Sequence, residues 1–279
     1  MLSYLHAFHA GNHADVLKHI VLVQILDHLA AKKKPLRYID THAGAGGYSL
    51  RSAAALKTRE HETGIGRLWH VADTPPAAGR LLDLVREFNA GGAQLLRYPG
   101  SPWLARACLR SRDSLYLFEL HPSEHRALGQ HYGADPRVTV LREDGLAACI
   151  GLVPPPERRA LVFIDPSYET KNEAERVVDT LVKAHRRFST GVYAIWYPVI
   201  DRRWVDRFER AIRATQIDAL QLYELSVAAD AADQGLTGSG MVVVNPPWKL
   251  RAAMRLTLPW LAGALAAAGG AGAHRVIDL

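Results

Sequence analysis

The chain of 279 residues is long enough for one large domain, or for one domain that carries an insertion. Its 48% hydrophobic and 22% charged residues are typical of a soluble protein with a sizeable core, and they exclude a disordered or fibrous chain. The two cysteines, Cys108 and Cys149, are too few for a disulfide framework or a cysteine-based metal site. The net charge of +6 favours a polyanionic partner, because lysine and arginine neutralise phosphates.

The ends of the chain carry no targeting or membrane signal that we recognise. The first residues lack the charged start and apolar stretch of a secretory signal, so we expect a cytoplasmic protein. Residues 256–273 are the least charged stretch, but Pro259 interrupts them and most are Ala or Gly. They predict a C-terminal helix with a loose tail rather than a membrane span. We also expect a monomer, since nothing in the sequence implies an obligate protein partner.

Residues 4–19 are rich in histidine and run into a helix predicted over 15–31. His9 and His13 lie four residues apart and, with Asp15, could act as metal ligands. However, the Gly-Asn pair between the histidines breaks any helix that would place both rings on one face. No glutamate between them could serve as a general base. We therefore expect no metal here.

The same segment also suits a lid that presents Tyr4, His6 and Lys18 to a pocket. Lys18 falls in the first turn of a mostly apolar helix, which we expect Asn12 to cap. A charge in that position suggests a function. The alternative is that the long side chain simply extends to solvent.

Short apolar runs alternate with amphipathic stretches along the chain, which predicts an α/β sheet covered on both faces. We expect seven, mostly parallel strands, and the clearest helices lie at 15–31, 173–187 and 203–214. The predicted strands cover residues 36–40, 114–119, 138–142, 160–165, 192–198, 220–227 and 241–245.

A long segment separates the first two strands. A mononucleotide-binding unit normally reaches its second strand about 20 residues after the glycine loop, but Gly46 and Glu119 are 73 residues apart. We predict a small helical subdomain over 51–113, inserted into a main domain that comprises 1–50 and 114–279. The insertion contains ten basic against six acidic residues and so carries four of the six net charges. It is a candidate surface for gripping a substrate, with an ordinary solvated surface as the alternative.

The loop at residues 40–46 is a candidate cofactor site, because Gly44 and Gly46 permit a tight turn and close backbone approach to a ligand. The third glycine of a dinucleotide fingerprint is absent, so a plain turn is the alternative. Glu119 and Asp144 follow the next two strands, at the edge where such sheets bind ligands. These acids suit a ribose diol and an adenine amine, which both S-adenosylmethionine and NAD contain. Each acid could instead cap the following helix.

The most specific pattern is Asp165-Pro166-Ser167-Tyr168, at the end of a continuous apolar strand. An exocyclic amine on a nucleic-acid base is a poor nucleophile, because its lone pair is delocalised into the ring. The Asp165 carboxylate and the Pro166 carbonyl could accept its two hydrogens and direct the lone pair to a methylsulfonium. Tyr168 could then stack on a base that has left its helix. The pattern predicts methylation of a base amine, with an ordinary turn as the alternative.

A second stretch, Asn245-Pro246-Pro247-Trp248, also follows an apolar strand and fits the same kind of consensus. Strand order favours Asp165, because a reaction motif should close the fourth strand, after the two ligand-binding acids. Asn245 closes the seventh. We interpret it as the structural end of the last strand, with a wall of the pocket as the alternative.

These motifs together resemble the RlmJ family of 23S rRNA adenine-N6 methyltransferases. The matching segments are spread over nearly the whole chain: residues 6–19, 40–46, 98–102, 119–122, 196–198 and 240–249. The resemblance implies a Rossmann-like, S-adenosylmethionine-dependent methyltransferase with a helical insertion. It also implies 23S rRNA as the partner and its adenine at position 2030 as the substrate.

The resemblance also assigns residues to roles. Asp165 matches the catalytic acceptor, with Pro166, Tyr168 and Lys18 beside it. Tyr4 and His6 match positions tied to substrate or activity. Together with Gly44 of the glycine loop and Asp165, the implied cofactor contacts are His19, His42, Ser101, Glu119, Asp144 and Gly145.

One position departs from the family pattern, which is Asp-Pro-Pro-Tyr: Ser167 stands third. The acceptor carbonyl belongs to Pro166, so we expect the mechanism to survive with a looser turn. Two other functions stay open from the residues alone. One is a non-catalytic RNA-binding protein that uses the basic insertion, and the other is a nicotinamide-dependent oxidoreductase. The acids at 119, 144 and 165 argue against the first, and the missing third glycine argues against the second.

Overall fold

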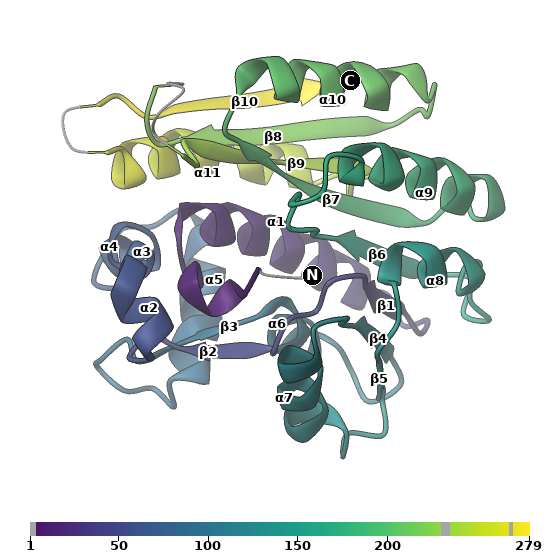
Figure 1. The fold of residues 1–279 in the computed structure, drawn as a ribbon, viewed down its shortest axis with the longest axis horizontal. Helices are drawn as coiled ribbons and strands as arrows, with labels where there is room; N and C mark the ends of the chain where they lie inside the picture. Colours follow the sequence, from purple (N-terminus) through teal and green to yellow (C-terminus); the bar gives the residue numbers. More distant parts are fainter. Residues whose placement is uncertain (1–3, 230–234, 268–269) are drawn as a thin grey trace.

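A computed structural model describes residues 4–229, 235–267 and 270–279. It is built on an eight-stranded sheet with the strand order β10-β8-β9-β7-β6-β1-β4-β5 (Figure 1). The strands are β1 (Arg37–Asp40), β4 (Ser114–Phe118), β5 (Val138–Leu141), β6 (Ala160–Ile164), β7 (Val192–Val199), β8 (Leu220–Ser226), β9 (Gly238–Val244) and β10 (Ala273–Asp278). Two short strands, β2 (Gly47–Ser49) and β3 (Arg97–Pro99), form a separate antiparallel pair.

The helices lie on both sides of this sheet. In chain order they are η1 (His6–Phe8), α1 (His13–Ala30), α2 (Ala53–Thr58), α3 (Glu60–Thr63), α4 (Ile65–Leu68), α5 (Pro76–Phe88), α6 (Ser101–Cys108), α7 (Pro122–Tyr132), α8 (Gly145–Gly151), α9 (Glu173–Arg187), α10 (Arg202–Ala214) and α11 (Leu250–Leu265).

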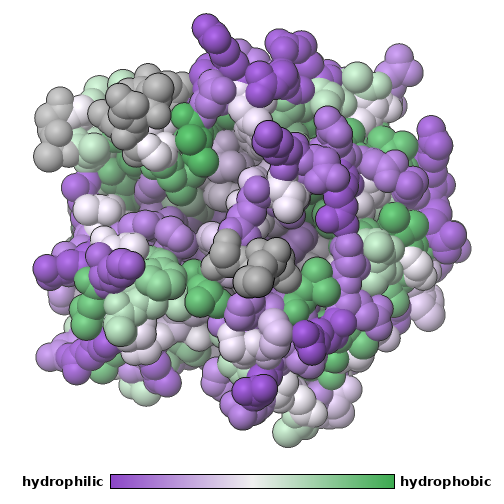
Figure 2. All heavy atoms as spheres, viewed as in Figure 1, coloured by the Kyte–Doolittle hydropathy of each residue, from purple (hydrophilic) through white to green (hydrophobic). Residues whose placement is uncertain are grey.

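Both faces of the sheet are buried, because successive residues of a strand point to opposite sides. Tyr38 and Phe163 point into a layer formed with α1, α5, α6 and α11. Ile39, which follows Tyr38, and Val162, which precedes Phe163, point to the other side, into a layer formed with α8, α9 and α10. A strand covered on both faces has to be apolar throughout, which explains the continuous apolar runs in the sequence. Charged and polar side chains cover the outer surface of α9 and α10 (Figure 2).

The predicted α/β class and mostly parallel sheet are confirmed, but the number of strands is eight rather than seven. Strands β5, β4, β1, β6 and β7 are parallel, whereas β9 runs antiparallel to both β7 and β8. The missed strand is β10, which pairs with β8 from Ala273↔Ser226 to Asp278↔Gln221. It is an edge strand with half-exposed or exposed side chains, so it lacks the apolar run that marks the other strands.

Helix α1 crosses one face of the sheet and is buried on nearly all sides. It begins at His13, and the side chain of Asn12 accepts a hydrogen bond from the Asp15 amide, so the predicted cap is confirmed. A helix that is apolar all round belongs in a core, and α1 packs against α5, α6, α11 and β9. Within the described ranges, neither α1 nor any other helix is long and apolar enough to cross a bilayer.

The segment between β1 and β4 forms β2, α2 to α6 and β3. Helices α5 and α6 pack on α1 within the main core layer, while α2 lies beside η1 (Figure 1). The chain then enters β4 next to β1. The division into a main domain and a subdomain over 51–113 stays a prediction.

Candidate active site

In the parallel part of the sheet, the strand order reverses at β1. The chain runs from β1 outward to β4 and β5, then returns to β6 on the other side of β1. Ligands in open α/β sheets bind beside such a reversal, at the carboxyl ends of the strands. Asp40 ends β1 and Asp165 follows β6, and the two strands pair in parallel register. These two carboxylates therefore lie at the position where a ligand is expected.

A buried lysine holds Asp165 from the neighbouring helix. The Nζ of Lys18 lies 2.6 Å from Oδ2 of Asp165 and 2.9 Å from Oδ1 of Asp15. Its side chain is 5% exposed, so extension to solvent, the alternative for Lys18, is wrong. Lys18 also lies over the Trp196 ring, 5.5 Å from its centroid. Helix α1 thus places a cation at the switch point, 147 residues away in sequence from the acid that it contacts.

Asp15 connects this pair to the start of the chain. Its Oδ2 lies 2.9 Å from Nε2 of His6 and accepts a hydrogen bond from the Gly11 amide. The other ring nitrogen of His6 lies 2.8 Å from the hydroxyl of Tyr4. The predicted residues Tyr4, His6, Lys18 and Asp165 are therefore brought together in one network. Asp15, the central member of this network, was not predicted from the sequence, although its place three residues before Lys18 is a signal.

Burial and charge decide the protonation of this network. Although burial opposes ionisation, His6 and Lys18 hold the pKa of Asp15 well below its usual range. Burial outweighs the attraction of Lys18 at Asp165 and raises the pKa of that carboxyl. Burial also lowers the pKa of Lys18, but Asp15 and Asp165 together raise it above its ordinary value. The lysine therefore stays charged, holds Asp15 ionised and opposes the rise in the pKa of Asp165.

The glycine loop after β1 is held by the acid after β4. Gly44 and Gly46 have φ angles of +59° and +79°, which only glycine adopts readily. The Gly44 amide donates to Oε2 of Glu119 over 2.9 Å, and the His121 amide donates to Oε1 over 2.6 Å. Burial raises the pKa of Glu119. The capping alternative does not hold for Glu119, since its side chain does not cap α7.

Asp144, at the start of α8, behaves differently. Its Oδ1 accepts from two amides of the first turn, so the capping alternative is confirmed for this acid. Its Oδ2 pairs with Arg176 at 2.5 Å, in a half-exposed ion pair. The next residue, Gly145, packs against the first loop: a Cβ there would meet the backbone oxygen of Thr41 at 2.2 Å. This glycine is thus required for α8 to approach the end of β1.

Asp40 is a buried acid that the sequence analysis did not single out. Its Oδ2 accepts hydrogen bonds from Ser101 and Tyr38, each over 2.7 Å. Burial raises the pKa of Asp40 to about 6. Its position as the last residue of a strand before the glycine loop was the available signal. Ser101, predicted as a cofactor contact, reaches the switch point through this acid.

Two predicted histidines lie beside the same edge, His19 buried and His42 half-buried. His19 is 2.9 Å from the Tyr98 hydroxyl through Nδ1, and His42 is 2.8 Å from the Thr41 hydroxyl. Burial lowers the pKa of His19 to about 3 and that of His42 to about 4. Both rings are therefore neutral at physiological pH and can either donate or accept a hydrogen bond.

Tyr168 closes the motif that begins at Asp165. Its φ of +55° is a left-handed conformation that a tyrosine rarely adopts, so the turn after Ser167 is strained. Its hydroxyl donates to the backbone oxygen of Trp196 over 2.7 Å, and its ring packs edge-on against Trp204. Its stacking on a base stays a prediction.

Asn245 lies at the opposite end of the strands from Asp165. It follows β9, which runs antiparallel to β7, so it lies near the start of β7 rather than its end. Its side-chain amide donates to the carbonyls of Ser189 and Gly191, just before that strand. The interpretation of Asn245 as a structural strand end is therefore confirmed, and a role as a wall of the Asp165 site is wrong.

Known proteins resemble this chain over nearly its whole length. A family model described as Ribosomal RNA large subunit methyltransferase D, RlmJ, matches residues 33–277. Two curated proteins named Ribosomal RNA large subunit methyltransferase J, from Haemophilus influenzae and Escherichia coli, are each 46% identical over 269 residues, which cover 96% of both chains. The crystal structure of a Legionella pneumophila protein matches with a TM-score of 0.88 and 36% identity, covering 97% of this chain and 98% of that one.

Proposed function

The chain belongs to the RlmJ family of ribosomal RNA large subunit methyltransferases, and from this premise we propose that it methylates the N6 amine of an adenine in 23S rRNA. S-adenosylmethionine is the proposed methyl donor. The eight-stranded sheet is the Rossmann-like fold of that enzyme class. The observation that carries the proposal is the carboxylate of Asp165 at the switch point, ion-paired to the buried Lys18.

Asp165 is the proposed acceptor for the target amine. Lys18 occupies its Oδ2, and no described residue donates to its Oδ1. An adenine amine could donate one hydrogen to this oxygen and the other to the carbonyl of Pro166, which would localise its lone pair for attack. Lys18 then has a positioning role, because it opposes the rise in the pKa of Asp165 and fixes the direction of the free oxygen.

The charged and polar groups at the carboxyl ends of the strands suit S-adenosylmethionine. When bound, this group supplies an electrophilic methyl on a positively charged sulfur. Asp15, Asp40 and Asp165 outnumber the single lysine there, so the field favours a cation. Glu119, beside the amide of Gly44, is the proposed acceptor for the ribose hydroxyls.

The remaining proposed cofactor contacts surround this edge. Asp144 and Gly145 begin α8, and their proposed partner is the adenine ring of the donor. His19, His42 and Ser101 supply neutral polar groups from α1, the glycine loop and α6. No group of three described His, Cys, Asp or Glu side chains could hold a metal ion.

A base inside a helix cannot reach Asp165, so we propose that the target adenine flips out into the site. Tyr4 and His6 are joined to the Lys18–Asp165 pair through Asp15, and the Tyr4 amide donates to the carboxylate of Glu169, just after the reaction motif. The proposed contacts of the flipped base are therefore Tyr4, His6 and Tyr168.

The test is direct. The protein, labelled S-adenosylmethionine and unmodified 23S rRNA are incubated, and the RNA is digested and analysed by mass spectrometry. We expect a single N6-methyladenine. Label in another base, or on the 5-carbon of a pyrimidine, would contradict the proposed specificity, and binding of NAD without any methyl transfer would contradict the reaction.

A further inference from the structure

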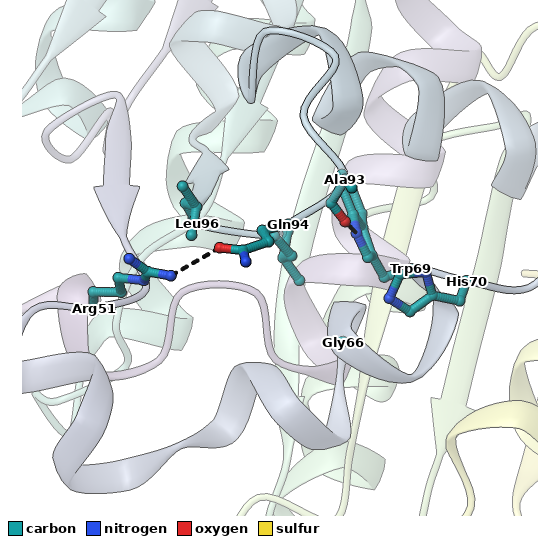
Figure 3. A pocket seen from close by; sticks show the side chains of 8 residues that line it. Arg51, Gly66, Trp69, His70, Ala93, Gln94 and Leu96 are labelled. Carbon is teal, nitrogen blue, oxygen red and sulfur yellow. Dashed lines mark hydrogen bonds between the residues drawn. The ribbon is translucent and has the colours of Figure 1, made fainter.

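A polar cavity lies outside the switch point, in the inserted segment. Its volume is about 390 Å³, within the range of about 300–1,000 Å³ that is usual for small-ligand sites. It is lined by Arg51, Gly66, Trp69, His70 and residues 93–96. Arg51 lies at one end and His70 at the other, with Gln94 between them (Figure 3).

The lining groups suit a nucleotide. Arg51 donates to the side-chain oxygen of Gln94 over 3.0 Å and forms no ion pair with any described carboxylate, so its charge is not neutralised. None of the lining residues is acidic. Trp69 is buried and donates to the Ala93 carbonyl, which fixes one wall, whereas His70 is exposed beside it. The cavity thus offers a cation for a phosphate at one end and an aromatic ring for a base at the other.

The chain connects this cavity to the segment that contacts η1, close to Tyr4 and His6. Arg51 follows β2, the short strand that comes directly after the glycine loop. Helix α2, next along the chain, contacts η1: Thr58 donates to the carbonyl of Phe8, and Lys57 lies over the ring of Phe8. An RNA strand whose target base enters beside Tyr4 would therefore pass α2 and reach this cavity.

We infer that this cavity is a second nucleotide site, which holds an unpaired nucleotide of the RNA substrate outside the target adenine. This inference rests on the proposed function. The nucleotide's phosphate lies against Arg51, and its base packs on His70 and takes a hydrogen bond from Gln94. The site increases affinity for long RNA and does not take part in methyl transfer.

The experiment compares variants in binding to a 23S rRNA transcript that contains the target adenine, by fluorescence anisotropy at several salt concentrations. Arg51→Ala should weaken binding and reduce the salt slope by about 0.7, because one phosphate contact is lost. His70→Ala should weaken binding about fivefold or more with an unchanged slope, since it removes only stacking. Ala93→Phe should weaken binding and also reduce the slope, because a filled cavity excludes both the base and its phosphate. Arg186→Ala, an exposed arginine on α9 in the opposite layer, is the matched control.

The turnover of each variant at saturating transcript separates the two proposals. If wild-type protein methylates the transcript and all three cavity variants bind it as Arg186→Ala does, the second site is refuted while the proposed function stands. If wild-type protein methylates no RNA, the proposed function fails, and the cavity loses its assigned ligand. Weaker binding with turnover near the wild-type rate supports the inference. A loss of turnover at saturation would contradict it, because it would place the cavity in the reaction site.

Discussion

Replacing Lys18 with methionine tests how the switch point is held together. The substitution keeps an unbranched apolar side chain one atom shorter but removes the charge that faces Asp15 and Asp165. Removing one partner of a buried ion pair costs about 3–5 kcal/mol, because the remaining charge has no compensation. We expect Lys18→Met to lower the free energy of unfolding at pH 8 by an amount in this range.

The pH dependence of this loss identifies its cause. Burial already raises the pKa of Asp165, and Lys18 opposes that rise, so the pKa of Asp165 should rise further in the variant. A carboxyl whose pKa is raised in the folded state favours folding at low pH, and this contribution is lost as the pH rises through its folded pKa. The difference between the two proteins should therefore shrink as the pH falls from 8 toward 5.

The assay is urea unfolding at both pH values. Lys183→Met is the matched control, because Lys183 forms an exposed i,i+4 pair with Asp179 on α9. We expect the control to lose less than about 1 kcal/mol at either pH. A loss of similar size in the two variants, or a Lys18→Met loss that does not change with pH, would refute the reasoning.

Three further predictions concern the rest of the site. Gly145→Ala should lower stability by about 1–3 kcal/mol in thermal unfolding, because the new Cβ meets the Thr41 carbonyl at 2.2 Å. The control is Gly151→Ala in the same helix, whose new Cβ meets nothing within 4 Å. Equal melting temperatures of the two variants would contradict the predicted clash. Asp40 should titrate near pH 6 in carboxyl ¹³C spectra, and a midpoint near 4 would show that it is not buried as described. Asn245→Ala should lower stability by about 1–2 kcal/mol but leave the methyl-transfer rate unchanged, since the Asn245 amide bonds only backbone carbonyls just before β7. A lower rate would show that Asn245 takes part in the active site.

Local patterns were sufficient to predict most of the fold. The continuous apolar runs marked seven of the eight main strands, because a strand with two buried faces has no polar side. The edge strand β10 escaped because it is half-exposed and follows an Ala/Gly tail. The Asn12 cap was also visible, since it depends on residues only three apart.

The arrangement of the site was harder to predict, because it depends on contacts between distant segments. Lys18 and Asp165 could each be singled out, but not their contact across 147 residues. Asp15 and Asp40 look like ordinary helix and strand ends until their partners are placed. Likewise, the sequence around Asn245 does not reveal that β9 runs antiparallel, and this direction is what removes it from the site.

The most direct test of the central claim is methyl transfer by Asp165→Asn. The amide keeps the size of the side chain but cannot act as the anionic acceptor, so we predict a fall of about a hundredfold or more in turnover of 23S rRNA. Affinity for S-adenosylmethionine, measured by calorimetry on the same preparation, should stay within a few-fold of wild type. Turnover retained with cofactor bound would contradict the account, because the acceptor of the amine would then lie elsewhere.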